Sequence, residues 1–197
     1  GAVTGGDRLF LQNESFSEKI IFPKKGRVHM KVKHISIAVD PEQTGNPVFG
    51  APADLTAYIL EPVEGITDKK RPAVLLCPGG GYHKLSGRED QPIAMKYLAA
   101  GFHVFVLHYS LVPDVFPRAL MELALSMKLI REHGNEWNVD VKRIAVSGFS
   151  AGGHLACCLG TFWNKEWLYK ALEVKPEMIQ PNGMILCYPV ITSEEYC

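Results

Sequence analysis

The sequence has no excess of charge of either sign and no long apolar run. Its 197 residues contain 21 Lys and Arg against 21 Asp and Glu, which gives a formal net charge of zero. The longest basic run is Lys69-Lys70-Arg71, too short to bind a polyanion, so we expect no nucleic-acid partner. No stretch approaches the roughly 18 consecutive apolar residues that a membrane span needs. We therefore expect no membrane partner either.

Cysteine is present in a number and spacing that fit neither a disulfide framework nor a zinc site. The five cysteines lie at positions 77, 157, 158, 187 and 197, without a Cys-x-x-Cys pair. Most stand in apolar segments, which is typical of buried free thiols. We expect no metal and no cofactor. Free thiols and the lack of a visible signal peptide favour a cytoplasmic protein, although secretion followed by removal of a signal peptide would leave the same sequence.

The N-terminal third of the chain mixes irregular and strand-like segments. Residues 1–27 are polar and predict an irregular lead-in to one domain that occupies residues 28–197. Residues 30–39 alternate apolar and polar side chains, which indicates a half-buried strand, and a slip of phase at Lys33-His34 predicts a β-bulge. Prolines and glycines mark residues 40–53 as a loop, and a second strand follows over residues 55–60.

Further along the chain, near-continuous apolar runs alternate with helical patterns. The apolar runs are typical of strands buried on both faces, and they cover residues 73–77, 104–108, 144–147 and 184–187. Helical spacing of apolar residues, each ending at a glycine, covers residues 92–100, 118–133 and 151–159. This alternation predicts an α/β fold, a mainly parallel sheet with helices on both faces.

A Gly-x-Ser-x-Gly pattern follows the third apolar run as Gly148-Phe149-Ser150-Ala151-Gly152. The bare pattern is moderately specific, but it lies between a buried strand and a helical segment, as a nucleophile elbow requires. There Ser150 would stand at a helix N-terminus, whose free N–H groups favour developing negative charge. We predict that Ser150 is a nucleophile; the alternative is a glycine-rich turn with an idle serine.

Three glycines follow the first apolar run, in Pro78-Gly79-Gly80-Gly81-Tyr82. Glycines allow backbone N–H groups to approach an oxyanion closely, so residues 79–81 are expected to direct their N–H groups toward the Ser150 Oγ. A glycine-rich turn can also bind phosphate. That alternative is weak, because no Gly-Lys-Ser/Thr follows and Gly-x-Gly-x-x-Gly is not matched.

These motifs resemble those of the α/β-hydrolase superfamily, and within it the lipase/esterase group with a His-Gly-Gly-Gly-type oxyanion loop, close to acetyl xylan esterase and related carbohydrate esterases. The resemblance extends over residues 55–190. Besides the two glycine motifs, it rests on Ser86-Gly87-Arg88-Glu89, His108-Tyr109-Ser110, Gly153-His154 and Tyr188-Pro189-Val190.

The resemblance implies a role for each matching residue. Ser150 corresponds to the nucleophile, and the backbone N–H groups of Gly80, Gly81 and Ala151 correspond to the oxyanion hole. Pro78 stands where many relatives have histidine, so a hydrogen bond that stiffens the loop elsewhere is absent. The fixed φ of proline can partly replace it.

A catalytic triad also needs an acid and a base, and in this superfamily both follow the nucleophile in the order Ser, acid, His. The residues after Ser150 do not supply this pair. The 47 residues after Ser150 contain one histidine, His154, a helical turn further on. We expect His154 to pack in the helix and the acid and base to lie beyond Cys197, so that the sequence corresponds to the first two-thirds of the domain.

Four other polar residues could lie near the site. His83, just after the glycines, and His108, at the end of a strand, are alternative candidates for the base, at positions that the superfamily does not use for it. Asp114 and Glu89 are expected to form a surface salt bridge or to cap a loop.

The resemblance implies a serine esterase that hydrolyses short-chain esters, above all acetyl esters of sugars such as xylo-oligosaccharides, through an acyl-serine. Its expected partner is a small-molecule ester. A peptidase, amidase or formamidase on the same fold and a non-catalytic fragment are the alternatives. We also expect residues 184–187 to form an apolar sheet edge with Trp163 and Trp167 exposed nearby, which favours self-association or a longer polypeptide.

Overall fold

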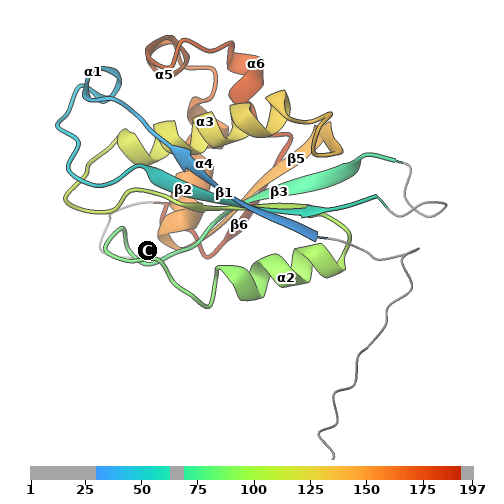
Figure 1. Ribbon diagram of the computed structural model, residues 1–197. Coiled ribbons are helices and arrows are strands. Elements are labelled where there is room, and N and C mark those ends of the chain that lie inside the picture. The colour runs from blue at the N-terminus through green and yellow to red at the C-terminus, as the bar shows by residue number, and fades with distance from the viewer. Residues whose placement is uncertain (1–29, 63–68, 192–197) are drawn as a thin grey trace, which may run out of the picture.

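A six-stranded sheet runs through the computed structural model, which describes residues 30–62 and 69–191 (Figure 1). Its strand order is β1-β2-β4-β3-β5-β6. β3 pairs in parallel with β4 and β5, and β5 in parallel with β6, whereas β2 pairs antiparallel with β1 and β4. The strands are β1 (Met30–Ile37), β2 (Ala53–Leu60), β3 (Arg71–Cys77), β4 (His103–His108), β5 (Val139–Phe149) and β6 (Gly183–Cys187).

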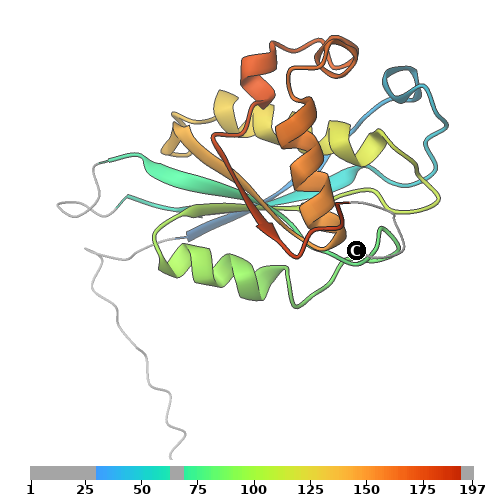
Figure 2. The same cartoon turned by 180° about the vertical axis from the view of Figure 1, so that it is seen from behind.

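Helices cover both faces of this sheet, as Figures 1 and 2 show from opposite sides. They are α1 (Pro41–Thr44), α2 (Gln91–Ala99), α3 (Arg118–Glu132), α4 (Ala151–Phe162), α5 (Glu166–Ala171) and α6 (Pro176–Ile179). Among the described residues, α2 is the one helix on one face, with Leu98 against Val74 and Val104. α3 and α4 pack on the other face against Leu75 and Phe105. The predicted α/β architecture is confirmed.

The central strands are buried on both faces because successive side chains enter opposite cores. The side chains of β3 from Ala73 to Cys77 are at most 1% exposed, as their continuous apolar run predicted. Parallel strands place their carboxyl ends at one edge of the sheet, where ligand sites of such folds form. None of the helices in the described ranges is long and apolar enough to span a membrane.

The predicted bulge at Lys33-His34 is wrong. β1 and β2 pair without interruption from Met30 opposite Leu60 to Ile37 opposite Ala53. Lys33 takes the place of an apolar residue on the covered side of β1: its Nζ lies 5.4 Å from the centre of the Trp137 ring and its stem packs along apolar surface. The covered side therefore begins with a lysine, and Met30 stays exposed.

Gly160 does not end α4, which continues to Phe162. A Cβ on Gly160 would lie 2.0 Å from the Sδ of Met184 on β6. The glycine thus allows helix and strand to pack closely, a role that a helix pattern alone does not reveal. The predicted loop over residues 40–53 also contains the short helix α1.

β6 pairs only with β5 within the described ranges. Its Met184 and Ile185 are 48% and 38% exposed, and Trp167 on α5 is 43% exposed. Trp163 is half-buried. The predicted lead-in over residues 1–27 lies outside the described residues.

Candidate active site

Ser150 occupies a sharp turn between β5 and α4, with φ 51° and ψ −117°. A residue with a Cβ holds such a conformation only where its surroundings impose it. A Cβ on Gly148 would lie 2.1 Å from the Gly152 carbonyl oxygen, and one on Gly152 would lie 2.1 Å from the Cys77 carbonyl oxygen. The turn therefore packs directly on the end of β3, and its strand–turn–helix geometry is that of a nucleophile elbow.

Backbone hydrogen bonds fasten Ser150 to the segment that follows β6. The Ser150 N–H donates to the Cys187 carbonyl at 3.0 Å, and the Ser150 carbonyl accepts from Val190 at 3.3 Å and from His154 at 2.9 Å. The Ser150 backbone is thus held from two sides. Sequence periodicity gave no sign of this contribution from residues 187–190.

The glycine loop lies beside the nucleophile. Gly80, Gly81 and Ser150 line one cavity of about 400 Å³. Gly80 and Gly81 have φ of 137° and 66°, which disfavour any side chain, and a Cβ on Gly80 would lie 2.0 Å from the Lys84 carbonyl oxygen. No hydrogen bond in the described ranges engages the N–H of Gly80 or Gly81. Ala151, at the start of α4, has an N–H without a helical partner.

Gly79 departs from the expectation that all three glycines direct N–H groups toward Ser150. Its N–H donates instead to the Glu89 Oε2 at 2.8 Å. The other carboxylate oxygen of Glu89 accepts the Tyr188 hydroxyl at 2.7 Å, and this bond raises the pKa of Tyr188. Glu89 therefore caps a loop, one of the two roles expected for it. The hydrogen bond from Tyr188 to Glu89 was not predicted, although Tyr188 belongs to one of the motifs that carry the family resemblance.

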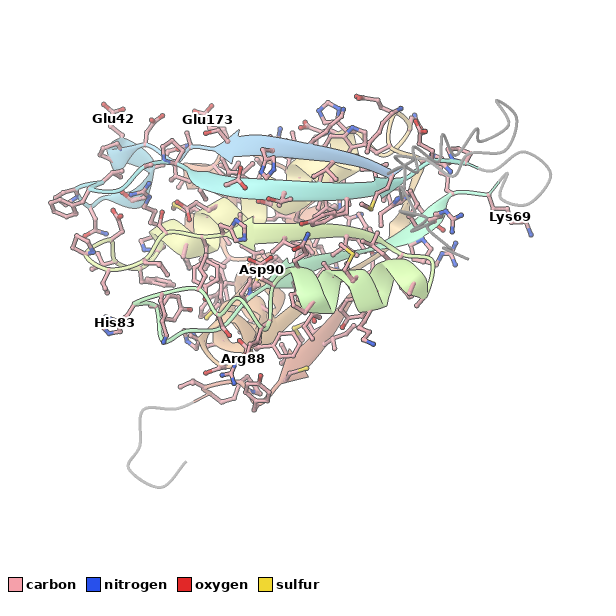
Figure 3. All side chains as sticks on the ribbon, turned by 60° about the horizontal axis from the view of Figure 1, so that its bottom comes forward. Glu42, Lys69, His83, Arg88, Asp90 and Glu173 are labelled. Carbon is pink, nitrogen blue, oxygen red and sulfur yellow. The ribbon has the colours of Figure 1, made fainter. Side chains whose placement is uncertain are left out.

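The rest of the cavity wall is largely polar. Besides the glycines it carries Lys84, Ser86, Arg88, Glu89 and Tyr188. Figure 3 shows Arg88 on the loop that leads from β3 to α2, where its side chain is exposed.

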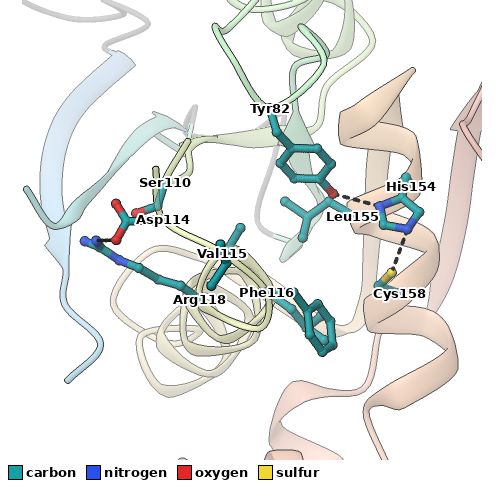
Figure 4. A pocket seen from close by; sticks show the side chains of 11 residues that line it. Tyr82, Ser110, Asp114, Val115, Phe116, Arg118, His154, Leu155 and Cys158 are labelled. Atoms are coloured by element: carbon teal, nitrogen blue, oxygen red, sulfur yellow. Dashed lines mark hydrogen bonds and ion pairs between the residues drawn. The ribbon is translucent and has the colours of Figure 1, made fainter. Parts of the chain in front are cut away.

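His154 faces a different cavity, of about 170 Å³, with Tyr82, Leu155 and Cys158 (Figure 4). Its Nδ1 lies 2.8 Å from the Tyr82 hydroxyl and its Nε2 lies 3.5 Å from the Cys158 Sγ. Burial raises the pKa of Cys158 to about 11, so this thiol is neutral at neutral pH. The cavity that Ser150 lines does not include His154.

The remaining candidates, His108, His83 and Asp114, are not among the residues that line the Ser150 cavity. The His108 Nε2 lies 2.6 Å from Asp90, and this bond raises the His108 pKa. His83 is exposed on the loop (Figure 3). Asp114 caps a loop, one of the two roles expected for it, by accepting the N–H groups of residues 49 and 50, and its ion pair with Arg118 at 2.6 Å is buried rather than on the surface.

No metal-binding group of three or more His, Cys, Asp or Glu side chains occurs in the part of the chain that the structure describes. The cysteines of that part, Cys77, Cys157, Cys158 and Cys187, are free thiols. No histidine is among the described residues that line the Ser150 cavity.

The sheet order, the elbow after β5 and the glycine loop after β3 define an α/β-hydrolase, a fold that solved neighbours of this chain share. Residues 62–184, more than half of the chain, match the BD-FAE family. The chain belongs to that family.

Named relatives include carbohydrate-active enzymes. The chain is 32% identical over 156 residues to endo-1,4-beta-xylanase B of Butyrivibrio fibrisolvens, covering 75% of this chain and 23% of that protein. It is 30% identical over 124 residues to an acetylxylan esterase of Xylanibacter ruminicola, covering 62% and 23%. A solved acetyl ester-xyloside bifunctional hydrolase from Caldicellulosiruptor lactoaceticus matches with a TM-score of 0.65 and 29% identity, over 84% of this chain and 60% of that one. The chain thus spans under a quarter of the length of these two curated relatives.

Proposed function

We propose that this chain carries the nucleophile and the oxyanion hole of a serine esterase that hydrolyses acetyl esters of sugars such as xylo-oligosaccharides. One observation carries the proposal: Ser150, held in an elbow, shares a cavity with two glycines whose N–H groups have no partner within the described ranges. Acyl transfer needs this pairing of nucleophile and donors.

The chemistry is a two-step acyl transfer. The Ser150 Oγ attacks the ester carbonyl carbon, and the carbonyl oxygen becomes an oxyanion. No histidine is among the described residues of the cavity, so in this chain water accepts the Ser150 proton, and the oxyanion hole alone accelerates acylation. The N–H groups of Gly80, Gly81 and Ala151 donate to that oxyanion. Collapse of the tetrahedral intermediate releases the sugar hydroxyl, which takes a proton, and water then hydrolyses the acyl-serine. The start of α4 adds a favourable dipole at the site of negative charge.

The polar wall of the cavity supports a sugar as the alcohol part of the ester. Lys84, Ser86 and Arg88 offer hydrogen-bond donors to hydroxyl and ring oxygens, and the Tyr188 hydroxyl oxygen, whose hydrogen is given to Glu89, can accept a hydrogen bond. The acetylxylan esterase and the acetyl ester-xyloside hydrolase among the similar proteins point to the same class of substrate.

Covalent labelling tests the proposal. The 197-residue chain is treated with a fluorophosphonate and with p-nitrophenyl acetate, and the modified residue is mapped by mass spectrometry. We expect one label per chain, on Ser150, and a loss of acylation on the order of 10³-fold or more in Ser150→Ala. Ser36→Ala, an exposed serine on β1, is the control.

Two results would overturn the proposal: no labelling of the chain, or labelling that is the same in Ser150→Ala as in the wild type. A second panel compares acetylated xylo-oligosaccharides with peptide anilides and formamides. Faster acylation by the amides would replace the esterase by an amidase on the same fold.

A further inference from the structure

We infer that Glu89 is a positioning residue for the oxyanion hole: its carboxylate ties Gly79 to Tyr188 and so fixes the direction in which the next glycines present their N–H groups. The inference rests on the proposed function. Glu89 lines the same cavity as Ser150. Its negative charge there opposes formation of an oxyanion, so its presence calls for a geometric explanation.

Both backbone groups of Gly79 are held by one short segment. Its N–H donates to the Glu89 Oε2 at 2.8 Å, and its carbonyl accepts from the Ser86 N–H at 2.8 Å. The Glu89 N–H in turn donates to the Ser86 carbonyl at 3.0 Å. The Gly79 carbonyl and the Gly80 N–H belong to one planar peptide unit, so fixing the first fixes the direction of the second.

The same contact explains why three glycines are present although the oxyanion hole uses two. Gly79 has no positive φ, so its backbone does not require glycine. A Cβ there would lie 2.6 Å from the Glu89 Oε2, 2.6 Å from the Phe149 carbonyl oxygen and 3.1 Å from the Ser150 Cβ. The first glycine is needed so that the carboxylate can reach a backbone amide beside the nucleophile.

The second oxygen of Glu89 reaches the opposite side of the site. It accepts the Tyr188 hydroxyl at 2.7 Å, and the Tyr188 ring contacts the Phe149 ring with centroids 5.8 Å apart. Tyr188 directly follows Cys187, whose carbonyl holds the Ser150 N–H. One carboxylate therefore joins the oxyanion loop to the segment that fastens the nucleophile, and both of its oxygens are occupied.

The turn that carries Glu89 is anchored at its far end. Asp90, the next residue, pairs with His108 at the end of β4 at 2.6 Å. The carboxylate of Glu89 thus acts from a fixed base rather than from a free loop.

Three variants of the 197-residue chain test the inference, with p-nitrophenyl acetate as acylating probe. Glu89→Ala removes both contacts and should slow acylation of Ser150 roughly 10- to 100-fold, through kcat with little change in KM, because oxyanion bonds form in the transition state. Glu89→Gln can still accept from Gly79 and bind Tyr188, and it should keep most of the rate. Tyr188→Phe should lie between the two.

A second measurement does not depend on turnover. Hydrogen exchange of the Gly79 amide, followed by NMR with ¹⁵N-glycine, should be on the order of tenfold faster in Glu89→Ala and near wild type in Glu89→Gln. Equal acylation of wild type and Glu89→Ala, a Gln variant as slow as Ala, or an unchanged Gly79 amide would each overturn the inference. A wild-type chain that takes no acyl group on Ser150 would instead overturn the proposed function, and the inference with it.

Discussion

Ser150 keeps its left-handed backbone because the glycines around it leave no room for any other arrangement. A Cβ on Gly152 would meet the Cys77 carbonyl oxygen at 2.1 Å and the Pro78 carbonyl oxygen at 2.5 Å. Both are backbone atoms at the end of β3, which cannot rotate away as a side chain would. The space beside β3 thus controls the position of the nucleophile.

We therefore expect Gly152→Ala to push the elbow away from β3. It should lower the free energy of unfolding by about 3 kcal/mol, as overpacking of a tight site does, and abolish acylation of Ser150. Gly183→Ala is the matched control, because a Cβ there meets nothing within 4 Å. Urea unfolding of both variants measures the difference; equal stability would show that the turn can relax.

His108 is a residue whose charge should affect stability. It is half-buried and faces Asp90 at 2.6 Å and Asp54 at 3.5 Å. The hydrogen bond to Asp90 raises the pKa of His108, so the folded chain binds the proton more tightly than the unfolded chain. The resulting stabilisation is fully present below the usual histidine pKa of about 6.5 and is lost as pH rises through the raised value.

Replacement by His108→Gln should accordingly cost about 1 kcal/mol near pH 6, since the pair is partly exposed to solvent, and less near pH 9. Urea unfolding at the two pH values checks this. A cost of His108→Gln that grows with pH would contradict the prediction.

Among the elements, α3 is held at its start by buried charges. The Arg118 Nε donates to Glu122 at 3.0 Å, its Nη2 donates to the Ala51 carbonyl at 2.8 Å, and Asp114 lies 2.6 Å from its Nη1. Burial raises the pKa of Glu122, and Ser110 and Arg118 oppose the rise. This network joins α3 to the loops that precede β2 and follow β4.

Arg118→Met should destabilise the chain by about 3–5 kcal/mol, because two carboxylates would remain buried without their cation. The control lies on the same helix: Lys128 pairs with Glu132 at 2.7 Å in an exposed position, and Lys128→Met should cost less than about 1 kcal/mol. Denaturant titration compares the two. Similar losses would mean that the buried network contributes no more than a surface pair.

Sequence patterns located most of the strands and helices, and they misread the details that depend on contacts with distant residues. β3, β4, β5 and β6 each contain one of the four near-continuous apolar runs. β1 carries Lys33 on its covered side, which alternation reads as a slip, and Gly160 reads as a helix end because its contact lies on another element. A local sequence pattern cannot show which residues of a distant strand a given side chain will contact.

The predictions for the site show the same difference between local motifs and contacts of distant residues. Ser150 and the glycine loop were found because their motifs are local. The Glu89–Tyr188 bond joins residues 99 positions apart, and its role depends on two loops meeting at the ends of parallel strands.

At the scale of the whole molecule, the two edges of the sheet differ in protection. β1 carries Lys31, Lys33 and His34, and charged side chains on an edge strand discourage pairing with another chain. β6 carries no charge over Gly183–Cys187, and its Met184 and Ile185 are exposed. Within the described ranges both edge strands have unpaired backbone groups, and of the two only β6 presents them between apolar side chains.

We therefore predict that the 197-residue chain self-associates through β6. Its weight-average mass in sedimentation equilibrium should rise between about 1 and 100 µM, the range of a weak interface. Ile185→Lys should reduce this association, because a lysine there must be desolvated when two edges pair. Val32→Lys, on the exposed side of β1, should leave it unchanged. A wild-type chain that stays at 21.8 kDa throughout would show that the β6 edge is protected in a way that its residues alone do not reveal.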